Sequence, residues 1–382
     1  MTGENVTPEA AADQLALDRV LDGIGPLDAT AMAGAADRLD RLTKPPGSFG
    51  QLETVVIELA GITGRADPSV EHGVVVVAAG DHGVTRLGVS AYPSDVTAQM
   101  VANFVAGGAA INVLGAWAGL RVVVVDAGVA SPIPTHGADP HRGGRLVQAR
   151  IRNGTGDMTL GPAMTRAEAL RAVVTGIDLA GELSASGVDL LGIGEMGIGN
   201  TTAASAICAV LTGRPVADVT GRGTGIDDAT HRHKIAAIER ALEVNSPDRR
   251  DPIGVLAAVG GLEIALLVGV IVGGAEARIP VVLDGFITGA AALVAANLQP
   301  AVAPRLIAAH RSIEPGHGVI LETLGRQPLL DLDLRLGEGT GAALAMGLIK
   351  AAVRVRDEMA TFESAAISGP TAGDGPGDTG AT

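Results

Sequence analysis

The middle of the chain alternates short apolar runs with amphipathic stretches. Apolar runs rich in β-branched residues occupy 73–80, 121–128, 188–194 and 279–285, and a weaker one occupies 305–310. Each is apolar almost throughout, which is typical of parallel strands covered on both faces. Helical patterns separate them, including 165–183, which opens with Thr165 and Glu168 at capping-box spacing, and 227–244. This alternation predicts an α/β fold with a parallel β-sheet flanked by helices.

The two ends of the chain carry helical patterns only, at about 8–21, 28–43, 48–62 and 339–362. We expect the ends to pack together as a small helical domain beside the sheet. The predicted division is a flexible N-terminal extension at 1–24, the small helical domain at 25–65 plus 336–361, and the α/β domain at 66–335. Residues 362–382 are rich in Gly, Pro, Asp and Thr, so we expect a disordered tail there.

Composition and charge exclude several classes of function. The net charge of −14 argues against nucleic-acid binding and against polybasic membrane binding. The single cysteine, Cys208, excludes an intrachain disulfide, and its apolar surroundings predict a buried side chain. The apolar region 254–285 is interrupted by Glu263 and Glu276, which leaves a run of 12 residues, shorter than the roughly 20 that span a bilayer. The polar N-terminus does not have the pattern of a signal peptide, and we expect a cytoplasmic protein.

Polar residues stand at the carboxyl end of every predicted strand. In chain order they are Asp81-His82, Asp126, Glu195, Asp284 and His310. Ligands of open parallel sheets bind beyond these ends. Asp and Gly are common in any strand-to-helix turn, but their recurrence at five strand ends favours a binding site.

The glycine-rich stretch 191–203, LGIGEMGIGNTTA, fits two phosphate-binding patterns. The dinucleotide pattern G-x-G-x-x-G requires an acidic residue at the end of the next strand, and Asp218 lies at a suitable distance but in a poor strand. The triphosphate pattern G-x4-G-K-[ST] has Asn200 in place of its lysine. The interpretation that remains is a single phosphate held by backbone amides, Asn200 and Thr201, as in a mononucleotide. A dinucleotide-dependent oxidoreductase is therefore disfavoured.

Other polar motifs have two interpretations each. The turn 221–228 could supply further amides or simply cap the next helix. Glu338, flanked by glycines before an Ala-rich helix, is either a catalytic acid or base or a charge at a helix N-terminus. His231 and His233 suggest a metal, but residues two apart face different ways on a helix, so we favour a solvated helix face and predict no metal site.

Six blocks in order carry a family resemblance. They are LTKPPGSFGQLE (42–53), AGDHGV (79–84), GIGEMGIGNTT (192–202), LDGFITGAAAL (283–293), HRSIEPGH (310–317) and RLGEGTGAALAM (335–346). Over about 25–360 the chain resembles the nicotinate-nucleotide–dimethylbenzimidazole phosphoribosyltransferases of cobamide synthesis. The resemblance implies a Rossmann-like sheet, a small helical domain built from both chain ends, a homodimer, and no cofactor or metal. The implied reaction converts nicotinate mononucleotide and 5,6-dimethylbenzimidazole into α-ribazole 5′-phosphate and nicotinate.

The resemblance also implies roles for individual residues. Glu338 would be the general base, and Glu195 would lie near the ribose as a second acid or base. The phosphoribosyl and nicotinate site would comprise Gly197, Asn200, Thr201, Gly223, Ser312 and Arg335, with Lys234 and Asp284 as lesser candidates. Lys234 could equally be a surface charge. The base pocket would comprise Asp81, His82, Tyr92, Pro93, Gln99 and Met100.

The base pocket departs from the family pattern. The family has a Ser-Pro pair and a downstream Gln, whereas this chain has Tyr92-Pro93 and Met100, with Gln99 one place away. The acceptor is thus left open between 5,6-dimethylbenzimidazole, another benzimidazole, adenine and a phenol. A protein that binds or senses nicotinate mononucleotide without catalysis is the alternative from another class.

Overall fold

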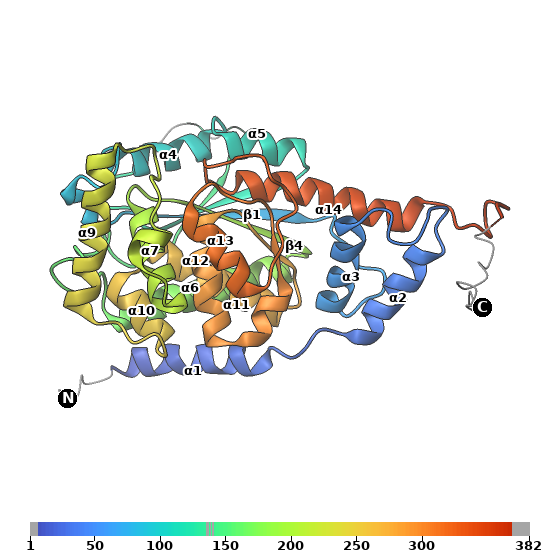
Figure 1. The fold of residues 1–382 in the computed structure, drawn as a ribbon, viewed down its shortest axis with the longest axis horizontal. Coiled ribbons are helices and arrows are strands. Elements are labelled where there is room, and N and C mark those ends of the chain that lie inside the picture. The colour runs from blue at the N-terminus through green and yellow to red at the C-terminus, as the bar shows by residue number, and fades with distance from the viewer. Residues whose placement is uncertain (1–6, 135–136, 138, 140, 369–382) are drawn as a thin grey trace, which may run out of the picture.

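The computed structural model describes residues 7–134, 137, 139 and 141–368 (Figure 1). Its centre is a six-stranded parallel sheet with strand order β3-β2-β1-β4-β5-β6. The strands are β1 (Gly73–Gly80), β2 (Arg121–Gly128), β3 (Arg145–Gln148), β4 (Leu190–Met196), β5 (Val281–Leu283) and β6 (Leu306–Ala308). The chain order reverses direction between β1 and β4, and ligands of such sheets bind at this point.

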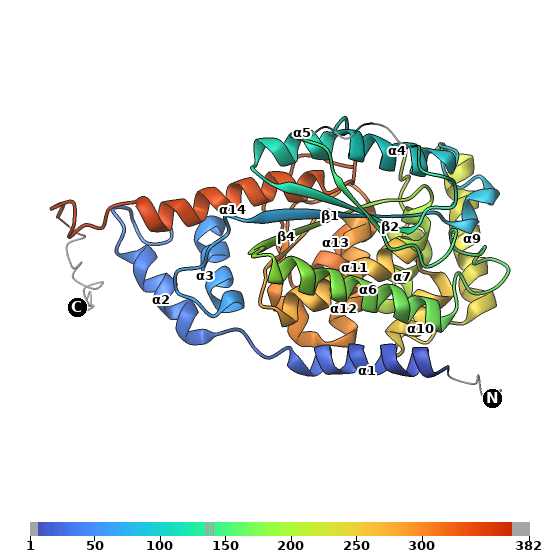
Figure 2. The same cartoon turned by 180° about the vertical axis from the view of Figure 1, so that it is seen from behind.

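Helices cover both faces of the sheet (Figures 1 and 2). One face carries α6 (Arg166–Ala185), α7 (Asn200–Thr212), α10 (Pro252–Val259), α11 (Leu262–Glu276) and α12 (Phe286–Leu298), and the other carries α4 (Asp95–Ala106), α5 (Ala110–Trp117) and α14 (Thr340–Glu358). Around α7 lie α8 (Val216–Val219), α9 (Asp228–Asn245) and α13 (Pro315–Leu324). Successive β1 side chains enter the two layers alternately: Val74 and Val76 join one core cluster, Val75 and Val77 the other. The predicted α/β class with a parallel sheet is confirmed.

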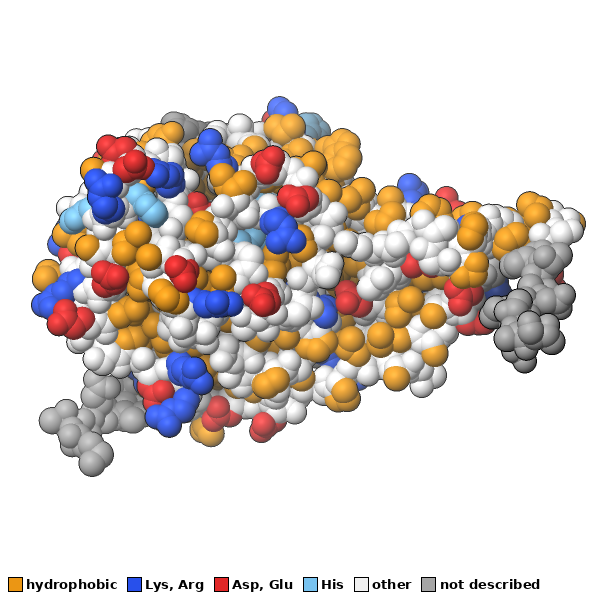
Figure 3. Space-filling view, in the orientation of Figure 1, with side chains coloured by type: hydrophobic (Ala, Val, Ile, Leu, Met, Phe, Trp, Pro, Cys, Tyr) orange, Lys and Arg blue, Asp and Glu red, His pale blue; other side chains and the backbone are white. Residues whose placement is uncertain are grey.

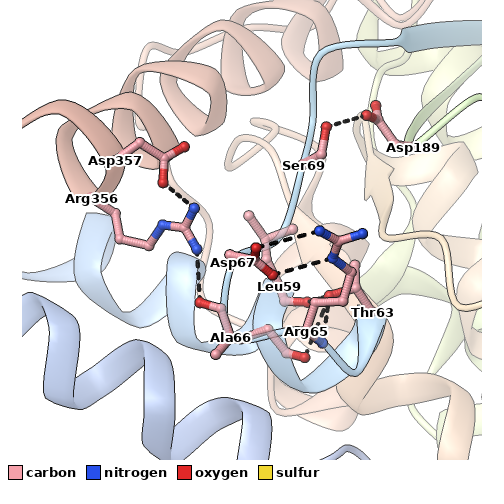
Figure 4. A network of polar contacts seen from close by, with 10 residues as sticks. Leu59, Thr63, Arg65, Ala66, Asp67, Ser69, Asp189, Arg356 and Asp357 are labelled. Atoms are coloured by element: carbon pink, nitrogen blue, oxygen red, sulfur yellow. Dashed lines mark hydrogen bonds and ion pairs between the residues drawn. The ribbon is translucent and has the colours of Figure 1, made fainter.

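The small helical lobe contains α2 (Ala29–Asp40), α3 (Gln51–Thr63) and the C-terminal half of α14. A β-bridge between Leu42 and Thr361 joins the two chain ends. At the junction with the sheet, Arg356 Nη1 donates to Ala66 O at 2.7 Å and Ser69 Oγ donates to Asp189 Oδ2 at 2.7 Å (Figure 4). The N-terminal half of α14 packs on β1, β4 and β5, so this helix belongs to both the helical lobe and the α/β domain. The predicted boundary at residue 336 therefore does not separate the lobe from the α/β domain.

The N-terminal segment differs from the expectation. Residues Pro8–Gly23 form the helix α1, which Thr7 caps by accepting from Ala10 N, and which packs on α6 and α11. Leu17 is only 1% exposed. The helical pattern expected at about 8–21 is confirmed. A flexible extension over 1–24 is wrong for 8–23, because this helix buries an apolar face. Residues 1–6 lie outside the described residues. In the predicted tail, Ile367 N donates to Phe362 O, and 369–382 lie outside the described residues.

Two further segments refine the predictions. The edge strand β3 was not predicted, because it has only four residues, is half-exposed and has a polar residue at each end. The stretch Asp95–Trp117 is long and apolar enough to cross a membrane by composition alone. It breaks into α4 and α5 at Gly107, whose φ is +84°, and both halves pack on the sheet. On the face shown in Figure 3, acidic and basic side chains are interspersed rather than gathered in one basic patch.

Candidate active site

A cavity of about 450 Å³ opens at the carboxyl ends of β4, β5 and β6. Four segments build it: the turn after β4, the β5–α12 connection, the residues after β6, and the loop before α14. α4 and the loop preceding it, together with Gly223 and Thr224 from the loop before α9, form the remaining wall. A second cavity of about 450 Å³ lies at the amino ends of β2 and β3, away from the polar strand ends.

The turn after β4 places two functional side chains. Glu195 lies at the end of the strand, and Asn200 at the start of α7 donates its Nδ2 hydrogen to Glu195 Oε2. Thr201 Oγ1 accepts from Lys234 Nζ at 2.7 Å. Lys234 is 1% exposed, lies behind Thr201 and does not line the cavity, so it is neither a surface charge nor a cavity wall. Burial, opposed by the charge of Glu314, lowers the pKa of Lys234 to about 8.

The first two glycines of the dinucleotide pattern lie within β4, not in a phosphate-binding turn. A Cβ on Gly192 would lie 2.6 Å from Met346 Sδ, and one on Gly194 would lie 2.3 Å from Gly339 N. These glycines therefore permit α14 and the loop before it to approach the strand. The sequence thus contains the dinucleotide pattern, but its first two glycines allow close packing of α14 on β4 and do not form a phosphate-binding turn.

Glu338 is the most constrained residue of the cavity. It has φ +64° and lies between Gly337 and Gly339, which also have positive φ. Asp284 accepts hydrogen bonds from Gly339 N at 3.2 Å and Ala342 N at 3.0 Å, so it caps α14 and fixes this loop from the end of β5. Glu338 is 7% exposed, and its Oε2 has no partner among the described residues. Burial, followed by the charge of Asp284, raises the pKa of Glu338 to about 7.

Three further titratable groups surround Glu338. Burial, then the charge of Asp284, raises the pKa of Glu195 to about 8, against the hydrogen bond from Asn200. Burial also raises the pKa of Asp284, while the charge of His310 opposes this rise. His310 Nε2 lies 3.9 Å from Asp284 Oδ1. Such clusters of buried groups with displaced pKa values are typical of catalytic sites.

Most of the residues expected at the site do line the cavity. They are Tyr92, Met100, Glu195, Gly197, Asn200, Thr201, Gly223, Asp284, Ser312, Arg335 and Glu338. Asn200 differs in its contact, because its amide donates to Glu195. The Gly223 N–H likewise donates to Glu314 Oε1 at 2.8 Å.

Four residues expected in the base pocket do not line the cavity. The side chain of His82 turns beneath the β4 turn, where its Nε2 lies 2.7 Å from Glu263 Oε1. Asp81 Oδ2 accepts from Ala130 N at 2.8 Å, beside β2. Pro93 and Gln99 are exposed, and Gln99 faces away because adjacent helical residues point about 100° apart. These four residues therefore lie outside the lining of this cavity.

Several cavity residues were not predicted, among them Glu314, Thr224, Phe286 and Thr288. Glu314 could have been found from its place in HRSIEPGH, two residues after Ser312, whereas nothing in the sequence distinguishes the others. His310 was noted as a strand-end residue. On α9, His231 and His233 contact backbone carbonyls, and within the described residues no three His, Cys, Asp or Glu side chains group as a metal site.

Comparison with known proteins identifies the family. A family model described as "Phosphoribosyltransferase" matches residues 24–367. The nicotinate-nucleotide–dimethylbenzimidazole phosphoribosyltransferase of Chloroflexus aggregans is 56% identical over 352 residues, which is 92% of this chain and 98% of that one. The enzyme of the same name from Roseiflexus sp. is 54% identical over 353 residues, again 92% and 98% of the two chains.

A solved structure agrees with these relatives. The crystal structure of CobT from Thermus thermophilus superposes with a TM-score of 0.82 at 48% identity, covering 89% of this chain and 99% of that one. The parallel sheet, the cavity at its carboxyl edge and these similarities together show that this chain belongs to the family of nicotinate-nucleotide–dimethylbenzimidazole phosphoribosyltransferases.

Proposed function

We propose that this protein transfers the phosphoribosyl group of nicotinate mononucleotide to 5,6-dimethylbenzimidazole, giving α-ribazole 5′-phosphate and nicotinate, with Glu338 as general base. The observation that carries the proposal is the loop of Glu338. It holds a buried carboxylate at the cavity wall with a pKa of about 7, close to the pH at which a base must accept protons and still be ionised.

The chemistry requires one proton acceptor. A nitrogen of the base attacks the anomeric carbon opposite the nicotinate, so the configuration inverts. As the new C–N bond forms, the bond to nicotinate breaks, and its electron pair neutralises the pyridinium ring, so that nicotinate leaves without needing a proton. The second nitrogen of the benzimidazole must lose its proton, and Glu338 accepts it. General-base help of this kind contributes about 10²–10⁴-fold.

Asp284 acts on Glu338 in two ways. Its two hydrogen bonds to the start of α14 fix the direction of the loop, and its charge raises the pKa of the Glu338 carboxyl. The positive end of the α14 dipole would by itself make Glu338 a weaker base. Burial and the charge of Asp284 outweigh that effect and keep the base effective near neutral pH.

The phosphate is assigned to the start of α7. The Thr201 hydroxyl and the turn amides lie there, with Lys234 behind Thr201 as a buried cation. Asn200 is assigned to hold Glu195 rather than the phosphate, because its amide already donates to that carboxylate. Glu195, with a pKa of about 8, is protonated near neutral pH and can donate a hydrogen bond to the ribose.

The acceptor base is assigned to the wall formed by Tyr92, Val96 and Met100. This wall is apolar and suits a flat ring. We retain a homodimer and a cytoplasmic location as expectations from the family resemblance.

Incubation of the purified protein with nicotinate mononucleotide and a panel of bases tests the proposal, with nicotinate release followed by chromatography. The panel contains 5,6-dimethylbenzimidazole, benzimidazole, adenine and phenol. Release that requires 5,6-dimethylbenzimidazole supports the reaction as proposed, and release with another base would correct the acceptor. Calorimetric binding of nicotinate mononucleotide without release by any base would instead favour a non-catalytic binding protein.

A further inference from the structure

A buried hydrogen bond joins the wall assigned to the acceptor base with the turn assigned to the phosphate. Thr97 Oγ1, on α4, accepts from Ile198 N at 3.1 Å. Thr97 is 0% exposed and does not line the cavity. Ile198 is the middle residue of the turn Gly197–Gly199 and does line it. This bond thus connects two walls of the cavity that are assigned to different substrates.

Thr97 lies within the helix that carries the base wall. Val96 precedes it, Met100 follows three positions later, and both line the cavity. The start of α4 has no side-chain cap from Ser94, although this residue holds the N-cap position. Near this end, Ala91 N donates to Thr224 Oγ1 at 3.2 Å in an exposed bond. Ser131 Oγ donates to Asp95 Oδ1 at 3.0 Å in a second exposed bond. The bond of Thr97 is buried and joins the base wall directly to the turn.

α4 also packs against β1, β2 and β4. The bond of Thr97 therefore joins a helix that the sheet supports to the glycine turn that follows β4.

We propose that Thr97 is a positioning residue, which holds the acceptor base and the nucleotide at reacting distance without contacting either one. The inference rests on the proposed transfer reaction, because only a reaction between two bound molecules needs the two halves of the cavity to be aligned. Reacting atoms must approach to about 3–3.5 Å, and a misplacement of about 1 Å can cost on the order of 10²-fold in rate.

The test compares three variants of the full chain. Thr97→Val keeps the shape of the side chain but removes the acceptor for Ile198 N, and Thr97→Ser keeps the acceptor. Thr202→Val is the matched control, because Thr202 is also 0% exposed and its hydroxyl has no partner among the described residues. Each variant is characterised by Tm, by calorimetric Kd for nicotinate mononucleotide without a base, and by kcat per nucleotide-binding site.

We expect Thr97→Val to lower kcat by about tenfold or more while the Kd for nicotinate mononucleotide changes less than about threefold. Thr97→Ser is expected to restore kcat to within about threefold, and Thr202→Val to leave it unchanged. A purely structural role would lower Tm and the number of binding sites, but not kcat per site. Unchanged kcat in Thr97→Val, or an equal loss in Thr202→Val, would overturn the inference.

A second variant covers the case in which Thr97→Val does not fold. Thr224→Val removes the exposed tie to Ala91, and we expect a loss of about threefold in kcat, since misalignment is smaller there. Unchanged kcat in that variant would then refute the positioning role. If the wild-type protein releases no nicotinate with any base, the proposed function fails, and this inference fails with it. If the wild-type protein is active and Thr97→Val keeps its kcat, only this inference fails.

Discussion

Replacing Glu338 by Gln is expected to change activity and stability in opposite directions. Gln keeps the size of the side chain and its φ of +64°, but it cannot accept the proton of the benzimidazole. We expect kcat to fall by about 10²–10⁴-fold, which is the usual contribution of a general base. In wild-type protein the rate should rise with pH through about 7, as Glu338 ionises, and this rise should be lost in the variant.

The stability effect follows from the same pKa. The Glu338 carboxyl has a pKa of about 7 in the folded protein and an ordinary value of 4.5 in the unfolded chain. Between these values the folded state binds more protons than the unfolded state, so the free energy of unfolding decreases as pH rises from 4.5 to 7. The shift corresponds to at most about 3 kcal/mol, and solvent in the open cavity reduces this to between about 1 and 3 kcal/mol.

Glu338→Gln removes this cost, which is fully present at pH 8 and nearly absent at pH 4.5. The Tm of the variant should therefore exceed that of wild-type protein by a few degrees at pH 8 and match it near pH 4.5. Differential scanning fluorimetry at both pH values, beside nicotinate release at pH 8, measures the two effects. A Tm difference that is the same at both pH values would refute the displaced pKa, even if activity were lost.

Three further predictions concern the walls of the cavity. Glu195→Gln retains a hydrogen-bond donor and acceptor, so initial rates at pH 7 should fall by less than about 10²-fold, and Tm should rise at pH 9 because the cost of ionising a carboxyl with a pKa of about 8 is removed. Lys234→Met should raise the KM for nicotinate mononucleotide by about tenfold, with a smaller change in kcat, because one cation near the phosphate contributes roughly 1–2 kcal/mol to binding. Initial-rate kinetics measure both constants. Gly194→Ala would place a Cβ 2.3 Å from Gly339 N, so urea unfolding should show a loss of several kcal/mol and nicotinate release should be abolished. Gly181→Ala, at an exposed position of α6 with nothing within 4 Å of the new Cβ, is its control and should add about 0.5–1 kcal/mol.

The sequence predicted the sheet well because buried strands carry a local signal. The runs of β1, β2 and β4 are apolar on both faces and buried along almost their whole length. The edge strand β3 lacks it, since half-exposed strands need few apolar residues. The helix α1 was predicted, but its packing on the α/β domain was not, because its apolar face is narrow and its partners α6 and α11 lie more than 140 residues further along the chain.

The site was harder to predict at the level of single side chains. Strand ends and glycine turns indicated where the cavity lies, and Glu338, Glu195 and Asp284 do line it. Neighbours in sequence can nevertheless face opposite ways: Met100 lines the cavity while Gln99 is exposed. His82 follows a strand end but is drawn away by its buried hydrogen bond with Glu263, a partner 181 residues distant that no local pattern reveals.

The packing of α14 on glycines 192 and 194 also bears on how the protein matures during synthesis. All six strands precede residue 309, whereas α14 starts at Thr340. The sheet can begin to collapse around α6 and α11 while this helix is still unmade, because the N-terminal parts of a chain emerge first during synthesis. Until α14 arrives, β4 presents a bare glycine groove and Asp284 lacks the helix start that it caps. A nascent chain would thus possess its phosphate turn well before it possesses its base.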